Sequence, residues 1–95
     1  MKNKIQLQLF QSDKCSVCHA IEPKISMLCE KKFPQIEFTI IRAEESPKHC
    51  GQNRIFSFPA VLIVKNGREV WRKLGAMGIN EIEQALTNIS ESEYR

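Results

Sequence analysis

The sequence predicts a single α/β domain over residues 1–95, with a four-stranded mixed sheet and about three flanking helices in the order β-α-β-α-β-β-α. Apolar and polar residues alternate over residues 5–9, which is the period of a strand with one buried face. Apolar residues then recur at helical spacing over residues 16–32. An Asn66-Gly67 pair between two further apolar runs is a strong signal for an antiparallel hairpin.

The first half of the chain is expected to form a strand, a helix and a second strand. A polar turn at residues 11–14 follows the first strand and leads into a helix over residues 16–32, whose buried stripe should include Val17. Pro23 lies inside this helix and is expected to kink it, because proline removes a backbone donor. Residues 36–41 are rich in β-branched and aromatic side chains and should form the second strand, parallel to the first.

The middle of the chain predicts a short helix and a hairpin. Ser46 is the expected N-cap of a helix over residues 47–54, with proline at its first position. Residues 60–64 are almost continuously apolar, as in a central strand, and residues 68–74 should return antiparallel beside them. The sheet is therefore expected to carry helices on both faces.

The end of the chain predicts an amphipathic helix over residues 80–89. Asn80 and Glu83 have the spacing of an N-cap residue and its N3 partner. Residues 90–95 have the composition of a frayed polar tail.

Composition excludes several classes of function. The net charge is only +3, the basic residues are dispersed, and there is one Trp and one Tyr, so nothing favours nucleic-acid binding. No window approaches the run of about 18 apolar residues that a membrane span needs. Glutamines interrupt the first apolar segment and no small-residue cleavage site follows, so we expect a cytoplasmic protein. In a reducing compartment, its four cysteines should be catalytic, metal-binding or inert.

The stretch DKCSVCHAIEP contains Cys15 and Cys18 at the spacing of a redox dithiol, followed at once by His19. Cys15 falls where a strand gives way to a helix, so its thiolate would face unsatisfied N–H groups and the positive end of the helix dipole. Lys14 adds a positive charge, and such settings lower cysteine pKa values to roughly 3.5–7.5. Cys18 lies one turn later on the same face, should be less exposed, and is suited to attack a mixed disulfide at Cys15.

Two metal-based alternatives use the same residues. A c-type haem would take both cysteines as anchors and His19 as axial ligand, but the predicted sheet and the absence of an export signal weigh against it. A zinc site needs four ligands, and His49-Cys50 is a poor second pair because adjacent side chains diverge. We expect Cys29 to be a small buried hydrophobic residue, Cys50 to be a packing or partly exposed residue, and His19 to lie on the helix surface.

Taken together, these motifs resemble the thioredoxin family over about residues 5–90. The resemblance rests on the Cys-x-x-Cys at a helix start, on Pro23 at the family's spacing, on Ser57-Phe58-Pro59, and on the hairpin that leads to Gly75. It implies a thioredoxin-like fold of minimal, glutaredoxin-sized form and a cis peptide bond before Pro59.

The resemblance also implies a mechanism. Cys15 would attack a substrate disulfide and Cys18 would resolve the mixed disulfide, with no cofactor or metal besides the redox-active disulfide itself. The implied partners are disulfide-containing proteins and an electron donor, either a reductase of thioredoxin-reductase type or glutathione, and the protein is expected to be a monomer. The residues implied to support the dithiol or to contact substrate are Lys14, Ser16, Val17, Phe58, Pro59, Gly75 and Ala76.

The sequence departs from the family pattern around the dithiol. Lys14 stands where the family has Trp, and Ser16-Val17 replaces the usual Gly-Pro between the cysteines. Leu9 occupies the position of the family's buried Asp, and the accompanying Lys is replaced near Ile40. The family's proton acceptor for the second cysteine is therefore missing, and we expect slower deprotonation of Cys18 unless Glu22, Asp13 or water substitutes.

Three functions follow from these residues. The first is a thiol–disulfide oxidoreductase that reduces protein disulfides through Cys15 and Cys18. The second is a glutaredoxin-like, glutathione-dependent reductase, although no Gly-Gly pair follows the strand after Pro59. The third is a non-catalytic binding protein that uses the same fold.

Overall fold

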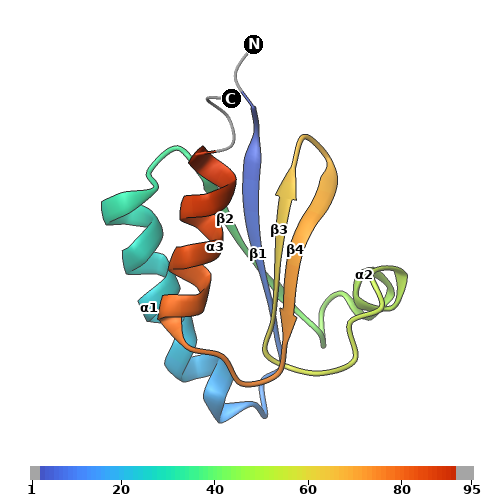
Figure 1. Ribbon diagram of the computed structural model, residues 1–95. Coiled ribbons are helices and arrows are strands. Elements are labelled where there is room, and N and C mark those ends of the chain that lie inside the picture. The colour runs from blue at the N-terminus through green and yellow to red at the C-terminus, as the bar shows by residue number, and fades with distance from the viewer. Residues whose placement is uncertain (1–2, 92–95) are drawn as a thin grey trace.

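The computed structural model describes residues 3–91 and has the element order that the sequence predicts (Figure 1). Of these residues, none belongs to a helix long and apolar enough to cross a membrane. The elements in chain order are β1 (Ile5–Gln11), α1 (Ser16–Lys32), β2 (Glu37–Arg42), α2 (Pro47–Gln52), β3 (Ala60–Lys65), β4 (Arg68–Leu74) and α3 (Ile79–Glu91).

The strands form one mixed sheet in the order β2-β1-β3-β4. β1 pairs with β2 in parallel, as a strand-helix-strand crossover requires, and it pairs with β3 antiparallel. β4 returns along β3 through the predicted turn, where Asn66 and Gly67 both adopt positive φ, at 54° and 82°. The predicted mixed sheet and hairpin are thus confirmed.

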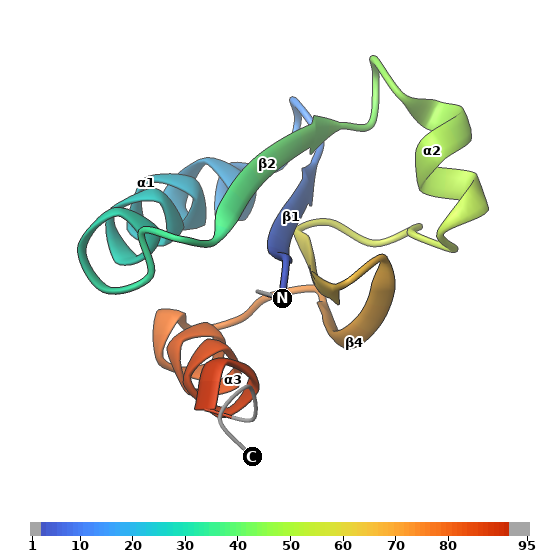
Figure 2. The ribbon, with the colours of Figure 1, turned by 90° about the horizontal axis from the view of Figure 1, so that it is seen from above.

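The helices cover both faces of the sheet (Figure 2). α1 and α3 lie together against one face, over a core that includes Leu7, Leu9, Ile25 and Leu86. α2 lies on the other side, where a smaller core forms. The buried residues of this smaller core are Phe10, Cys50, Ile55, Ala60 and Leu62.

The buried stripe of α1 differs from the sequence prediction at its start. Val17 is 44% exposed, whereas Cys18 is fully buried, so the prediction for Val17 was wrong. Cys18, Ile21, Ile25 and Leu28 follow one another at spacings of three and four residues, which makes them a continuous helix face. Val17 lies one position to the side of that face and remains free for contacts outside the chain.

α3 is longer than predicted at both ends. It begins at Ile79, so the N3 residue is Glu81, whose side chain accepts a hydrogen bond from the backbone N–H of Gly78. The expected Asn80–Glu83 capping pair was therefore wrong, and Glu83 instead forms an ion pair with Lys32 of α1. The frayed tail was predicted from residue 90, but α3 continues to residue 91, and residues 92–95 lie outside the described part of the chain.

Other element boundaries also differ from the prediction. Gln11 was assigned to a polar turn, but it pairs with Arg42 as the last residue of β1. α2 ends at Gln52, two residues earlier than predicted, and the side chain of Ser46 makes no capping hydrogen bond. The extension of β1 matters most, because it places Gln11 on the core side of the sheet just before the dithiol.

Candidate active site

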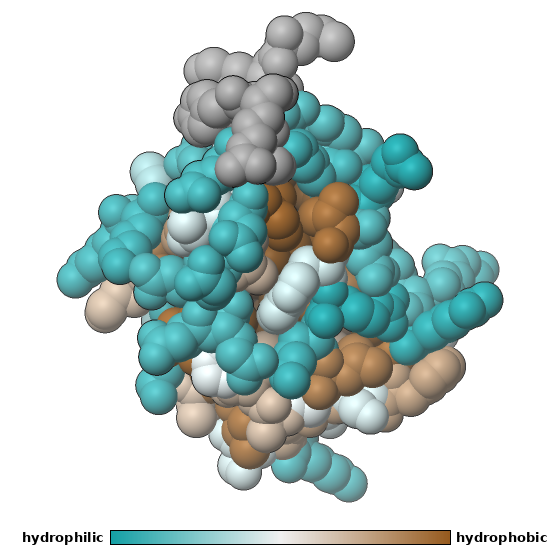
Figure 3. Space-filling view, viewed as in Figure 1, coloured by the Kyte–Doolittle hydropathy of each residue, from teal (hydrophilic) through white to brown (hydrophobic). Residues whose placement is uncertain are grey.

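Three chain segments meet at one end of the sheet. In the strand register, Phe10 lies opposite Ala60, and Ala60 lies opposite Leu74. The loop after β1, the segment before β3 and the loop after β4 therefore emerge side by side, at the lower end in Figure 1. The backbone N–H of Gly75 donates to the carbonyl of Pro59 at 2.8 Å, which ties two of these segments together. Brown and tan hydrophobic surface is visible at this end in Figure 3, and brown surface also lies higher on the same face.

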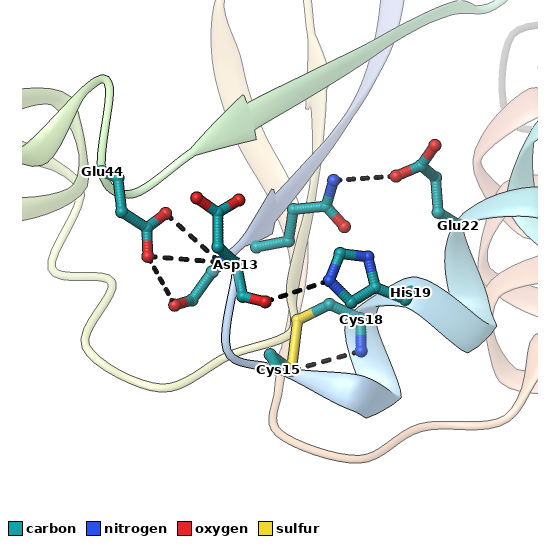
Figure 4. Close-up of a disulfide and its surroundings, with 8 residues drawn as sticks. Asp13, Cys15, Cys18, His19, Glu22 and Glu44 are labelled. Carbon is teal, nitrogen blue, oxygen red and sulfur yellow. Dashed lines mark hydrogen bonds between the residues drawn. A yellow bond between two sulfur atoms is a disulfide. The ribbon is translucent and has the colours of Figure 1, made fainter.

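Cys15 and Cys18 form a disulfide at the start of α1, with their Cα atoms 5.3 Å apart (Figure 4). Cys15 is the N-cap residue of α1, with extended backbone angles, and its Sγ accepts the backbone N–H of Cys18 at 3.2 Å. The sulfur thus occupies the place that a capping oxygen takes in other helices. A thiolate at this place is stabilised both by the donated hydrogen bond and by the positive end of the helix dipole.

The two sulfurs differ in their access to solvent. Cys15 is partly exposed, whereas Cys18 is completely buried against the core. The expectation that Cys18 is the less exposed of the pair is confirmed. Only Cys15 can be approached directly by a second molecule.

The loop before the dithiol is held by the segment after β2. The side chain of Glu44 accepts hydrogen bonds from the Ser12 hydroxyl, at 2.8 Å, and from the backbone N–H of Asp13. The hydrogen bond from Ser12 makes the largest contribution to lowering the pKa of the Glu44 carboxyl. The bond from Asp13 and the positive charge of Arg42 lower this pKa further. Arg42 also forms an ion pair with Asp13. The approach to Cys15 is therefore fixed by contacts about thirty residues away in the sequence.

The two histidines of the haem and zinc alternatives take part in other contacts. His19 is exposed, with a ring nitrogen 3.1 Å from the Asp13 carbonyl (Figure 4). His49 stacks on Phe10, with ring centroids 5.6 Å apart, while the neighbouring Cys50 points into the smaller core. Among residues 3–91, no three or more His, Cys, Asp or Glu side chains are grouped so that they could hold a metal ion.

The remaining cysteines are free and buried, as expected. Burial raises the pKa of the Cys29 thiol. It also raises the pKa of the Cys50 thiol, with a further contribution from the negative charge of Glu44. Both thiols therefore stay protonated at neutral pH and are poor nucleophiles.

The residues implied to contact substrate lie on all three segments at the dithiol end. Val17 is exposed beside the cysteines, Phe58 is partly buried, and the Phe58–Pro59 peptide bond is cis, as the resemblance implies. Gly75 has a φ of +83°, which favours glycine at that turn. Phe56 was not singled out from the sequence, yet it is 76% exposed two residues before Phe58. The other implied residues, Lys14, Ser16 and Ala76, are all exposed.

A family model described as thioredoxin matches residues 1–88 of the chain. The chain belongs to the thioredoxin family. It is 28% identical over 75 residues to thioredoxin-like protein YdfQ of Bacillus subtilis, covering 79% of this chain and 66% of that protein. It is also 28% identical over 87 residues to thioredoxin H2 of Arabidopsis thaliana, covering 92% of this chain and 64% of that protein. The match thus spans less than two thirds of the length of either relative.

Among solved structures, thioredoxin 1 of Thermosipho africanus superposes with a TM-score of 0.87 at 28% identity. The superposition covers 95% of this chain and 99% of that structure. The predicted thioredoxin-like fold is therefore confirmed by both sequence and structure.

The position at which the thioredoxin family has a buried acid is apolar here. Leu9 is fully buried, and it lies opposite Ile40 in the β1–β2 register. A buried polar residue on the same sheet face was not predicted from the sequence. Gln11, two residues after Leu9 on the same sheet face, is only 3% exposed, and its Nε2 donates to Oε1 of Glu22 at 2.8 Å (Figure 4).

The signal for Gln11 was present in the sequence as alternation. Ile5, Leu7 and Leu9 point to the core, so the next residue of that series is Gln11 if the strand continues. Composition alone instead predicts a polar turn there, because glutamine and the residues after it are hydrophilic. The strand period thus identifies a buried polar residue that composition alone conceals.

Proposed function

We propose that the protein is a thiol–disulfide oxidoreductase that reduces protein disulfides through Cys15 and Cys18. One observation carries the proposal: the Sγ atom of Cys15 caps α1, accepts a backbone N–H and is bonded to the sulfur of Cys18. This arrangement stabilises a thiolate on the more exposed cysteine and keeps its partner within bonding distance. Family membership supports the same activity.

The proposed reaction has two exchanges. The Cys15 thiolate attacks one sulfur of the substrate disulfide, forming a mixed disulfide and releasing the other substrate sulfur as a thiolate. Cys18 then loses its proton and attacks Cys15, so that the Cys15–Cys18 bond forms and the second substrate thiolate leaves. The substrate gains two electrons, and the oxidised pair is reduced again by a reductase or by glutathione.

We further propose that an extended substrate segment lies across the three segments at the dithiol end. The backbone of Phe58 would pair with it in the manner of an added strand, and Val17 and Ala76 would supply apolar contacts. The exposure of Val17 and Ala76 supports this placement. We expect a monomer in the cytoplasm, where Cys29 and Cys50 remain reduced.

Reduction of insulin disulfides tests the proposal, with dithiothreitol, thioredoxin reductase or glutathione as electron source. Catalysis with dithiothreitol and with one of the biological donors is the expected result, and the donor that works identifies the partner. Cys18→Ser should accumulate a mixed disulfide between Cys15 and insulin, visible by mass spectrometry. Absence of catalysis with all three donors would contradict the proposal and favour a binding role.

A further inference from the structure

We propose that Gln11 and Glu22 replace the missing buried acid, with Glu22 accepting the proton of Cys18 and Gln11 positioning the Glu22 carboxylate. The inference rests on the proposed function, in which Cys18 resolves the mixed disulfide. It identifies a proton acceptor at a place where neither Leu9 nor Ile40 can provide one.

The first step of the argument is geometric. Cys18 and Glu22 are four residues apart on α1, so their side chains are neighbours on one face of the helix. Gln11 lies on the sheet face that α1 covers. Its hydrogen bond to Glu22 places its side chain beside the turns of α1 that carry Cys18 and Glu22. Cys18 is fully buried and Glu22 is partly buried, so the carboxylate lies between the core and solvent.

The second step concerns a buried acceptor. Oε1 of Gln11 is buried and has no hydrogen-bond partner in the described disulfide form. A buried acceptor that lacks a donor is unfavourable. A disulfide sulfur has no hydrogen to donate, but reduction gives Cys18 an S–H group inside the same buried region. We infer that the Gln11 amide accepts from the Cys18 thiol in the dithiol form while it donates to Glu22.

The third step is the proton balance. During resolution the Cys18 S–H group turns from the Gln11 oxygen to a Glu22 oxygen and passes its proton there, and the resulting thiolate attacks the Cys15 sulfur. The Cys15–Cys18 bond forms, and the bond between Cys15 and the substrate breaks, with the electron pair leaving on the substrate sulfur. The proton on Glu22 then leaves to solvent, which its partial exposure allows. Gln11 takes no proton and acts only through Glu22 and Cys18.

A single-turnover reaction separates the two exchanges. Reduced protein mixed with the aromatic disulfide dithiobis(nitrobenzoate) releases one coloured thiolate when Cys15 attacks and a second when Cys18 resolves. Glu22→Gln keeps the size of the side chain and its ability to accept from Gln11. It should slow the second release about tenfold at neutral pH while changing the first less than about twofold. Gln11→Leu should also slow the second release selectively, because it frees the Glu22 carboxylate.

Glu30→Gln is the matched control, since Glu30 is an exposed residue two turns further along the same helix. It should leave both releases unchanged. As the pH rises, hydroxide removes the Cys18 proton without help from Glu22, so the Glu22→Gln defect should become smaller. A general loss of structure would slow both releases and would not recover with pH.

The inference is overturned if Glu22→Gln and Glu30→Gln give the same second release, or if the defect does not become smaller as the pH rises. Failure of the proposed function is a separate result. If Glu22→Gln selectively slows the second release but the wild-type protein never reduces insulin, the proton acceptor is supported and the proposed activity is contradicted. If the wild-type protein reduces insulin and Glu22→Gln has no defect, the proposed activity is supported and the role of Glu22 is contradicted.

Discussion

The two ends of α1 present cysteines in opposite environments. At the first turn, Cys15 is partly exposed and accepts a backbone N–H, while Cys18 lies beside it in the same disulfide. At the last turns, Cys29 is buried among apolar residues, and this burial raises the pKa of its thiol. One helix therefore has a reactive end and an inert end, and the difference arises from the unpaired N–H groups and from access to solvent.

Cys50 extends this comparison to a second helix. It lies in the last turn of α2, and its side chain packs in the smaller core and faces the negative charge of Glu44. Both effects raise the pKa of the Cys50 thiol. Cys15 differs from both Cys29 and Cys50 because it is the capping residue of its helix and is accessible.

The largest effect should come from removing the capping thiol. Cys15→Ser should lower the rate of insulin reduction at least about 1000-fold, because a serine hydroxyl is not ionised at neutral pH. Cys29→Ala, at the inert end of the same helix, should retain the wild-type rate per folded molecule. Comparable rates for wild type and Cys15→Ser would mean that the two ends of α1 do not differ as described.

Alkylation rates measure the same difference directly. In fully reduced protein at about pH 7, iodoacetamide should modify Cys15 at least about 100-fold faster than Cys29. The Cys29 rate should keep rising with pH beyond the ordinary thiol range, because burial raises its pKa. Peptide mass spectrometry resolves the two sites, and equal rates at neutral pH would refute the assignment.

An acid placed at position 9, where the thioredoxin family has a buried Asp, tests how apolar the core is beneath the dithiol. Leu9 is fully buried, so a new carboxyl there would have a pKa raised above its unfolded value of about 3.9. Leu9→Asp should therefore be less stable than Leu9→Asn by about 2 kcal/mol at neutral pH. The difference should appear as the pH rises through the unfolded pKa and vanish at more acidic pH.

Urea unfolding of both variants across this pH range provides the measurement. Leu9→Asn is the matched control, because it has nearly the same shape and loses the same apolar contacts without titrating. A stability difference that does not change with pH would show that water reaches position 9.

The smallest effect concerns Glu44 and Cys50. Glu44→Gln removes the charge that raises the Cys50 pKa, so alkylation of Cys50 at about pH 9 should become about twofold faster. Glu45→Gln is the control, because Glu45 pairs with Arg42 on the same loop. Equal alkylation rates of Cys50 in the two variants would show that burial alone raises the Cys50 pKa.

Local sequence signals determined the element order, the hairpin and the place of Cys15 at the start of α1. These features depend on residues only a few positions apart, such as the alternation of Ile5, Leu7 and Leu9 or the positive-φ preference of Asn66-Gly67. The resemblance carried by the Cys-x-x-Cys and Pro23 extended this to the fold of the whole chain.

Only the tertiary structure decided how the dithiol is surrounded. The bond from Gln11 to Glu22 joins residues eleven positions apart, and that from Ser12 to Glu44 joins residues thirty-two positions apart. The exposure of Val17 likewise depends on how α1 is turned against the sheet. Such contacts are set by the packing of whole elements, whereas propensity and periodicity report only on neighbours along the chain.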